Sequence, residues 1–257
     1  MKAKNSIWIL TALLSLSGCA KNDQEEQELA ASDATALVSY YSFDAQNADD
    51  GISGCDGIPF GDVKFVTDTP SGTGYAASLN GYKTGFINIP YNVFAGKTSY
   101  SIALWMKDFD FGTVISAISS DGPRADFPSF NVASYSKFYL RSRYDNWNDT
   151  PDFEYDIFNL KASGWHHVAV TCEPIDVLNH AKRQLYIDGK LVVSDTDAVQ
   201  AYYNVHGYAE DIITKVQMGG NRNGDYAQCM TMVIDNVRFY LKAISPQTVQ
   251  ELYKGKM

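Results

Sequence analysis

From Leu37 onward, the sequence is divided into about a dozen short stretches rich in β-branched and aromatic residues, each bounded by Gly, Asn, Asp or Pro. No helix-period stretches alternate with them, so a parallel sheet built from βαβ units is excluded. No repeat of about 20–50 residues is present, which disfavours a propeller or solenoid. The pattern predicts one all-β sandwich over residues 37–257. Its expected strands are 37–43, 75–79, 86–89, 100–107, 113–119, 129–135, 137–143, 153–158, 165–172, 183–194, 216–219 and 232–241.

The stretch 100–107 shows the alternation of a strand with one buried face. Ile102, Leu104 and Met106 fall on one side of such a strand, and Trp105 falls on the other. This alternation predicts that the first three residues face the core of the sandwich.

Two further local patterns define a turn and a helix. Asp188-Gly189 separates two strand-like runs, which predicts a tight hairpin with a type I′ turn. Ser245 followed by Pro246 is typical of a helix start, and the apolar residues within 249–253 share one helical face. The sequence therefore predicts one short helix at the C-terminus.

The first 18 residues are predicted to be a signal peptide. Lys2 and Lys4 precede an apolar run of about ten residues, which is too short to span a membrane as a helix. The run ends in Leu16-Ser17-Gly18-Cys19, which resembles a bacterial lipobox, so Cys19 is the predicted lipidation site. An ordinary secretory signal with a chance cysteine is the alternative.

Residues 19–36 are polar and acidic and lack hydrophobic periodicity, which predicts a flexible tether behind the lipidated cysteine. The acids after Cys19 resemble the surface-export signals of Bacteroidetes lipoproteins. They predict a protein of the outer membrane that touches the membrane through its lipid anchor and faces the cell surface. A position on the periplasmic side is the alternative.

Charge and cysteine content exclude several classes of protein. The 21 Lys+Arg against 30 Asp+Glu give a net charge of −9, which excludes nucleic-acid binding because a binder needs basic residues to replace counterions. The 4 cysteines are too few for a disulfide scaffold. After lipidation, Cys55, Cys172 and Cys229 remain, so at most one internal disulfide can form, and its pairing stays open.

Seven short motifs follow one another over most of the predicted sandwich. In chain order they are Ala77–Gly81 (ASLNG), Phe86–Pro90 (FINIP), Ser99–Lys107 (SYSIALWMK), Trp165–Thr171 (WHHVAVT), Leu185–Val192 (LYIDGKLV), Gln217–Asn221 (QMGGN) and Ile234–Tyr240 (IDNVRFY). Together they resemble the laminin-G-like domains of the concanavalin A-like lectin/glucanase superfamily. The resemblance implies a jelly-roll sandwich of two antiparallel sheets with a short C-terminal helix. It is weakest over residues 108–163.

One segment resembles part of a catalytic motif. Glu154 and Asp156 begin like the E-x-D-x-x-E strand of the retaining glucanases in this superfamily, but Asn159 stands where the third acid belongs. A neutral amide supplies neither a nucleophile nor an acid/base, so the motif is incomplete. The sequence therefore favours a protein without catalysis, and a glycoside hydrolase that uses Glu154 and Asp156 is the alternative.

The resemblance also implies a structural calcium ion between the first and last strands. Carried over, its ligands would be Asp235 together with Asp44 and Asn47. Asp235 is a lone acid within an apolar strand, and a buried carboxylate needs a compensating partner. Arg238 or a backbone N–H is the alternative partner to the metal.

Three loop segments combine aromatic rings with Asn, Asp, His and Arg. Such mixtures suit sugars, whose apolar faces stack on rings while polar side chains bind the hydroxyls. The alternative is that these rings cap the ends of the sandwich, and Trp105 and Trp165 are expected in its core. The predicted ligand-binding residues are Tyr144, Trp147, Asn148, Tyr202, Tyr203, His206, Arg222 and Asp225.

These features predict a non-catalytic surface lipoprotein that binds carbohydrate, with a glycan or polysaccharide as its partner. Two alternatives stay open. One is the glycoside hydrolase described above, and the other is an adhesion or assembly module that binds protein, as laminin-G domains often do.

Overall fold

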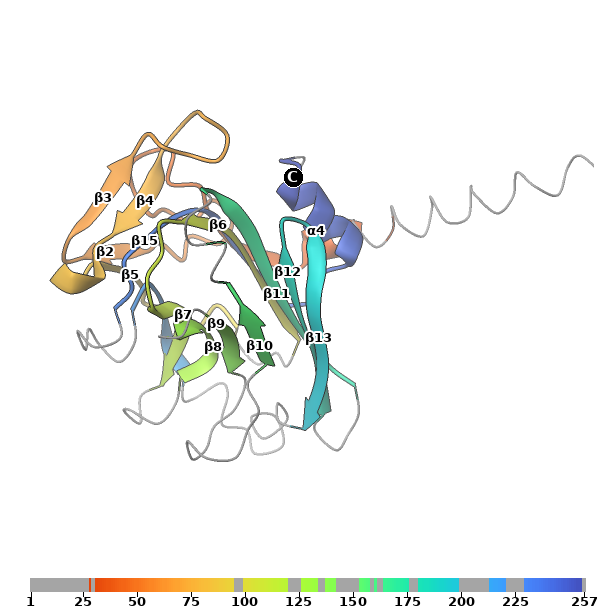
Figure 1. The fold of residues 1–257 in the computed structure, drawn as a ribbon. Helices are drawn as coiled ribbons and strands as arrows, with labels where there is room; N and C mark the ends of the chain where they lie inside the picture. Colours follow the sequence, from red (N-terminus) through yellow and green to blue (C-terminus); the bar gives the residue numbers. More distant parts are fainter. Residues whose placement is uncertain are drawn as a thin grey trace, which may run out of the picture.

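A computed structural model shows two antiparallel sheets packed face to face, with one helix at the C-terminal end (Figure 1). The predicted all-β sandwich of two antiparallel sheets with a short C-terminal helix is confirmed. The structure describes residues 28, 31–94, 99–119, 126–133, 137–141, 153–157, 160, 164–175, 180–198, 213–220 and 229–255.

The first sheet has eight strands, in the order β13-β12-β11-β6-β15-β4-β3, with β1 also paired to β15. Strand β15 lies between β6 on one side and both β1 and β4 on the other. The strands are β1 (Leu37–Tyr41), β3 (Val63–Val66), β4 (Ala76–Leu79), β6 (Tyr100–Lys107), β11 (His166–Pro174), β12 (His180–Ile187), β13 (Lys190–Ala198) and β15 (Met232–Tyr240).

The second sheet has seven strands, in the order β10-β9-β8-β7-β14-β5-β2. A 3-10 turn, η1 (Gly81–Lys83), joins β4 of the first sheet to β5 of the second. The strands are β2 (Ile58–Phe60), β5 (Phe86–Ile89), β7 (Gly112–Ser119), β8 (Asp126–Ala133), β9 (Lys137–Arg141), β10 (Phe153–Asp156) and β14 (Ile213–Met218).

Alternate side chains from the two sheets meet in one hydrophobic core. Leu104 from β6 and Val170 from β11 are buried there with Ile115 and Val216 from the second sheet. Each such side chain stabilises the fold by about 1.5–3 kcal/mol when it is removed from water. The face of β6 that the alternation assigned to the core is therefore confirmed.

The opposite face of the first sheet is partly covered by helix α4 (Pro246–Tyr253). Ala103 and Tyr240 on the sheet pack there against Val249 and Leu252 of the helix. The helix begins as predicted, because Ser245 Oγ accepts a hydrogen bond from the Thr248 backbone N–H at 3.2 Å and Pro246 occupies the first turn. We call this α4-covered side the outer face of the first sheet.

A β-bulge in β15 determines which residues reach the outer face. Asp235 is opposite Trp105 on β6, and Arg238 is opposite Ala103, so β15 has one extra residue between these pairs. Asn236, which lies within this bulge, has a φ of 52°. Because of the extra residue, Asp235 and Arg238 both lie on the outer face, although regular alternation would separate them.

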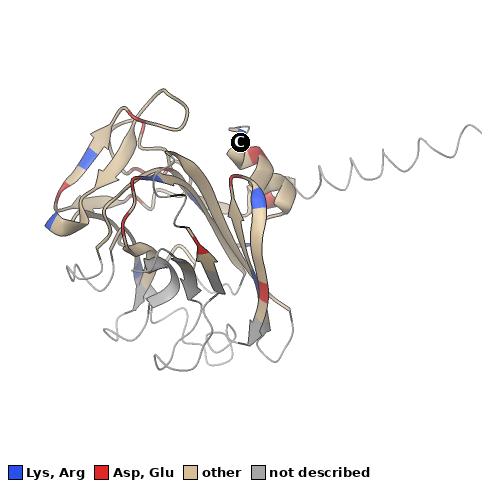
Figure 2. Ribbon diagram, in the orientation of Figure 1, with Lys and Arg blue, Asp and Glu red and all other residues tan. Residues whose placement is uncertain are grey.

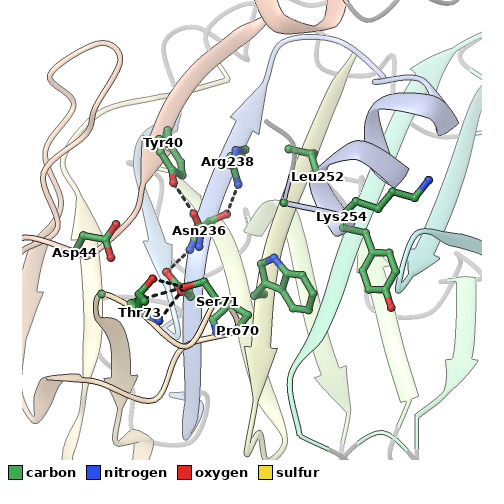
Figure 3. A pocket seen from close by; sticks show the side chains of 14 residues that line it. Tyr40, Asp44, Pro70, Ser71, Thr73, Asn236, Arg238, Leu252 and Lys254 are labelled. Atoms are coloured by element: carbon green, nitrogen blue, oxygen red, sulfur yellow. Dashed lines mark hydrogen bonds between the residues drawn. The ribbon is translucent and has the colours of Figure 1, made fainter.

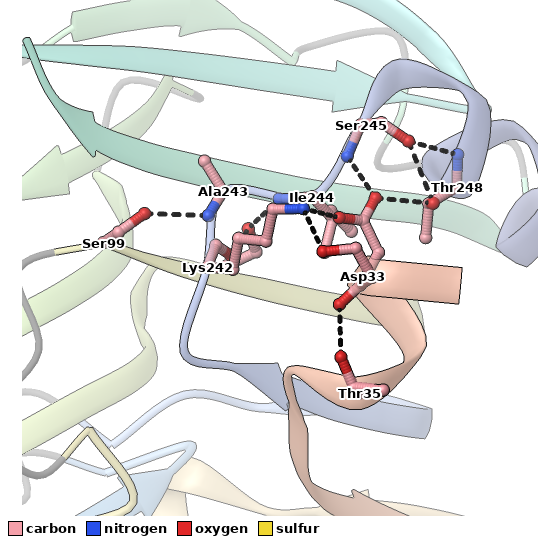
Figure 4. A network of polar contacts seen from close by, with 10 residues as sticks. Asp33, Thr35, Ser99, Lys242, Ala243, Ile244, Ser245 and Thr248 are labelled. Carbon is pink, nitrogen blue, oxygen red and sulfur yellow. Dashed lines mark hydrogen bonds and ion pairs between the residues drawn. The ribbon is translucent and has the colours of Figure 1, made fainter. Parts of the chain in front are cut away.

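The end of the predicted tether belongs to the domain. Residues 31–35 are helical, and the Asp33 side chain is fully buried. Its Oδ2 accepts hydrogen bonds from the Ser245 backbone N–H and from Thr248 Oγ1, both at 2.7 Å, and its Oδ1 lies 2.7 Å from Lys242 Nζ (Figure 4). Residues 31–36, expected as tether, are thus held by the start of α4.

Several predictions about the N-terminus and the cysteines have different outcomes. Cys19 and the predicted signal peptide lie outside the described residues, and within the described part no helix is both long and apolar enough to cross a membrane. In the described part of the chain, Cys55, Cys172 and Cys229 form no disulfide with one another, which answers the question that the cysteine count left open. Lys and Arg are scattered singly among Asp and Glu over the described ribbon (Figure 2).

Candidate functional site

A pocket of about 560 Å³ opens on the outer face of the first sheet, beside the C-terminal end of α4 (Figure 3). Strand β1, the turn after it, the loop between β3 and β4, strands β6 and β15, and the end of α4 all contribute to its wall. The lining residues are Tyr40, Asp44, Pro70, Ser71, Thr73, Gly74, Trp105, Asp235, Asn236, Arg238, Leu252, Tyr253, Lys254 and Gly255.

One wall of the pocket is aromatic. Trp105 stacks on Tyr253, with ring centroids 5.8 Å apart and an angle of 29° between the planes. The His167 ring meets Trp105 edge-on from β11, with centroids 5.4 Å apart. Trp105 is half-buried and Tyr253 is 39% exposed, so ring surface remains accessible from the pocket.

The expectation that Trp105 and Trp165 belong to the core is wrong. Trp105 lies on the outer face, opposite the core residues of β6. Trp165 is half-buried at the surface, where its Nε1 donates to Asp68 Oδ1 at 3.1 Å and Lys107 Nζ lies 5.6 Å from the ring centroid. Trp165 thus places its polar Nε1 edge at the surface, and Trp105 leaves part of its ring accessible on the outer face, so neither ring fills the core of the sandwich.

Arg238 is held in place by two neighbours. Its guanidinium carbon lies 4.2 Å from the centroid of the Tyr40 ring, and its Nη1 donates to the backbone oxygen of Asn236 at 3.2 Å. The Tyr40 hydroxyl in turn donates to Asn236 Oδ1. These contacts link β1 to the bulge of β15 and give the pocket a fixed polar wall (Figure 3).

Asp235 is a buried carboxylate on the floor of the pocket. It is 2% exposed, and its Oδ1 accepts a hydrogen bond from the Asn236 backbone N–H at 2.7 Å. No ion pair involves it within the part of the chain that the structure describes. Burial raises the pKa of Asp235 to about 7, and the negative charge of Asp44 contributes to the rise.

Asp44 stands at the mouth of the pocket, next to the loop between β3 and β4. Its Oδ1 accepts a hydrogen bond from the Tyr75 backbone N–H at 3.1 Å. Gly74 has a φ of 82°, and a Cβ at this position would lie 1.9 Å from Asp44 Oδ1. A glycine is therefore required for the loop to approach the carboxylate. The Ser71 hydroxyl donates to the Thr73 carbonyl at 2.8 Å and stiffens this loop.

The predicted calcium ligands are only partly brought together. Asp44 and Asp235 line the same pocket, whereas Asn47 is not among its lining residues and donates its Nδ2 to Asp49 Oδ2 at 2.6 Å. In the described residues, no group of three or more His, Cys, Asp and Glu is arranged as a metal site. Calcium takes six to eight oxygen ligands, so two carboxylates fit it incompletely, and calcium binding stays a prediction.

The two residues of the incomplete catalytic motif do not line this pocket. Glu154 and Asp156 lie in β10, an edge strand of the second sheet, and pair with Tyr139 and Lys137 of β9. The predicted sugar-binding residues lie outside the described residues and stay predictions: Tyr144, Trp147, Asn148, Tyr202, Tyr203, His206, Arg222 and Asp225.

Comparisons with known proteins agree with the fold. A family model described as the concanavalin A-like lectin/glucanases superfamily matches residues 80–250. A search of curated proteins finds no match.

Three solved structures illustrate the likeness. Domain 4 of AbnA, a GH43 extracellular arabinanase from Geobacillus stearothermophilus in complex with arabinotriose, is 20% identical with a TM-score of 0.56, over 84% of this chain and 98% of that chain. A structure of botulinum neurotoxin type C, whose cell entry depends on interaction with two ganglioside molecules, is 19% identical with a TM-score of 0.59, and the match covers 88% of this chain and 53% of that chain. The binding domain of botulinum neurotoxin DC in complex with rat synaptotagmin II is 18% identical with a TM-score of 0.59, and the match covers 88% of this chain and 52% of that chain. This chain thus spans about half of each neurotoxin chain, and identities this low show the fold alone.

Proposed function

Because the chain belongs to a laminin-G-type family of the concanavalin A-like lectin/glucanases superfamily, we propose that it is a non-catalytic module that binds carbohydrate in the pocket beside α4. One observation carries the proposal: the accessible aromatic surface of Trp105 and Tyr253 lies in the same pocket as two carboxylates. Structural relatives support it, since the arabinanase domain was solved with arabinotriose and neurotoxin type C interacts with gangliosides.

Each part of the pocket has a role in this proposal. The apolar face of a sugar ring stacks on Trp105, which removes both surfaces from water. Asp235 and Asp44 accept hydrogen bonds from the sugar, and bonds to a charged acceptor are stronger than neutral ones. Asp235 is directly opposite Trp105 across neighbouring strands, so a ring on the indole lies within reach of the carboxylate.

The side chains of the pocket need little rearrangement when a ligand binds. Its volume of about 560 Å³ falls in the range of about 300–1,000 Å³ that is usual for small-molecule sites. Asp44 is fixed by the Tyr75 N–H, and Arg238 is fixed by Tyr40 and Asn236. Groups that are already ordered lose less conformational entropy when a ligand binds.

A titration of glycan fragments against matched tryptophan variants tests the proposal. Trp105→Ala is expected to weaken binding at least about tenfold, because a stacked ring contributes on the order of 1 kcal/mol beyond its buried area. Trp165→Ala removes an equally large, half-buried ring elsewhere on the surface and is expected to leave affinity unchanged.

Three results would contradict this proposal in different ways. Affinity that survives Trp105→Ala but is lost in Trp147→Ala would move the site to the loops. New reducing ends that disappear in Glu154→Gln would show a glycoside hydrolase. A stable protein complex from the cell envelope, with no response to any glycan, would favour the protein-binding alternative.

We also propose that the chain is a lipoprotein held at the outer membrane through Cys19, with residues 20–30 as the free part of its tether. Labelled palmitate is expected to enter the wild-type protein and not a Cys19→Ala variant. Protease added to intact cells distinguishes the two sides of the membrane, because only a domain at the cell surface is digested.

A further inference from the structure

The buried carboxylate of Asp235 is only partly compensated by a neighbouring positive charge, because Arg238 lowers its pKa less than burial and the charge of Asp44 raise it. It is 2% exposed, its described hydrogen-bond donor is the neighbouring Asn236, and no described ion pair involves it. A buried ionised carboxylate without a partner costs several kcal/mol, so such groups are normally paired with a cation. The side of Asp235 that faces the pocket is therefore where a cation would be stabilised.

The cationic side chains of the pocket form no described ion pair with Asp235. Arg238 is stacked on Tyr40 and donates to the Asn236 carbonyl. Lys254 is exposed at the end of α4, and Figure 3 shows its ammonium pointing away from Asn236. Asp44 adds a second carboxylate at the mouth, and its described hydrogen bond comes from the neutral Tyr75 N–H.

The aromatic wall indicates what kind of cation fits. Ammonium groups are attracted to the faces of Trp and Tyr, and the apolar face of a sugar ring stacks on the same surfaces. A bare metal ion would use neither Trp105 nor Tyr253 and would occupy a small part of a pocket of about 560 Å³. Two carboxylates beside a stacked ring pair suit an organic cation carried on a ring.

We infer that the pocket recognises an amino sugar, with its protonated amine between Asp235 and Asp44 and its ring on Trp105. This inference rests on the proposed carbohydrate binding and names the class of sugar. Asp235 lies opposite Trp105 in the β6–β15 register, which brings the carboxylate and the stacking surface to one ligand.

Three trimers of equal length test the inference by calorimetry: one of glucosamine, one of N-acetylglucosamine and one of glucose. At pH 7 the glucosamine trimer is expected to bind at least about tenfold more tightly than the two uncharged trimers. Asp235→Asn keeps the shape of the side chain and is expected to abolish this preference.

A matched pair of glycine variants tests Asp44 without changing a charge. A Cβ at Gly74 would collide with Asp44 Oδ1, whereas a Cβ at Gly72, which has a similar φ of 75° in the same loop, meets nothing within 4 Å. Gly74→Ala is expected to reduce the preference for glucosamine, and Gly72→Ala is expected to keep it. Both variants carry the same kind of backbone strain, so a difference between them reports on Asp44.

The outcomes separate the inference from the function on which it rests. Uncharged trimers that bind as tightly as glucosamine would overturn the amino-sugar assignment and leave carbohydrate binding standing. A failure of all three trimers, and of a wider glycan panel, would overturn both. Calcium chloride that raises the melting temperature of the wild type but not of Asp235→Asn, and that competes with glucosamine, would show that the carboxylates serve the metal.

Discussion

The indole of Trp105 stacks on the phenol ring of Tyr253, with ring centroids 5.8 Å apart. The contact joins strand β6, in the middle of the first sheet, to the last residue of α4. It creates an aromatic surface beside Asp235 to which both elements contribute. The pocket therefore depends on where α4 lies as much as on the sheet.

Removal of the Tyr253 ring is expected to weaken sugar binding and to lower stability modestly. The ring is 39% exposed, and its pairing with Trp105 contributes about 0.5–1.5 kcal/mol to the fold. A sugar that loses a ring contact of similar strength is expected to bind roughly two- to tenfold more weakly. Tyr82→Ala, at a site 76% exposed and outside the pocket, is the control. Titration of both variants with the same glycan checks this, and an equal loss in both would contradict a role for the Trp105–Tyr253 pair.

The Asp33 carboxylate is expected to stabilise the whole domain. Asp33→Asn removes the ion pair with Lys242 and weakens the bonds to Ser245 and Thr248, at an expected cost of about 2–4 kcal/mol. For a domain of this size, that lowers the melting temperature by roughly 5–10 °C. Thermal unfolding by circular dichroism measures the change.

The effect of Asp33 is expected to depend on pH in a defined direction. Burial alone would raise the pKa of Asp33, but hydrogen bonds from Lys242, Ser245 and Thr248 outweigh it and hold the pKa below its usual value. The carboxylate therefore stabilises the fold above about pH 4, and this contribution is lost as the pH falls through its folded pKa. The difference between wild type and Asp33→Asn should shrink toward pH 3, and a difference that stays constant would contradict this account.

Local sequence patterns predicted the fold well, because strand alternation, the Ser245 cap and the Asp188-Gly189 turn are determined by near neighbours. The β12–β13 hairpin has Asp188 and Gly189 at φ values of 49° and 74°, as a type I′ turn requires. The pocket was missed because it depends on contacts between distant segments. The alternation did place Trp105 opposite the core face, but only the position of α4 shows what that face meets.

The boundary of the tether was mispredicted for a related reason. The composition of residues 19–36 is that of a solvated linker, and composition does not reveal that one carboxylate finds partners at the opposite end of the chain. Likewise, the bulge at Asn236 brings Asp235 and Arg238 to one face, which a regular period of two would not predict.

Truncation is expected to show where the tether ends. A chain that begins at residue 31 keeps the helical turn and Asp33, and it should unfold at the same temperature as one that begins at residue 19. A chain that begins at residue 37 loses these contacts with Lys242 and Ser245, and its melting temperature should fall by roughly 5–10 °C. Equal melting temperatures for all three would show that residues 31–36 are not part of the folded unit.

Asp235 is expected to lower the stability of the unliganded domain at neutral pH. In the unfolded chain its carboxyl ionises near pH 4, whereas in the folded chain burial raises its pKa to about 7. Between these values the folded state holds more protons than the unfolded state, so the free energy of unfolding decreases as the pH rises. Asp235→Asn cannot ionise and should lack this part of the decrease.

Urea denaturation at a series of pH values checks this expectation. The Asn variant should match the wild type near pH 4 and exceed it by roughly 4 kcal/mol above pH 7, because each unit of pKa difference corresponds to about 1.4 kcal/mol. The control is Asp49→Asn, which makes the same change from acid to amide at an exposed position outside the pocket. An Asp235→Asn curve that is parallel to the wild type would mean that a partner already neutralises the carboxylate.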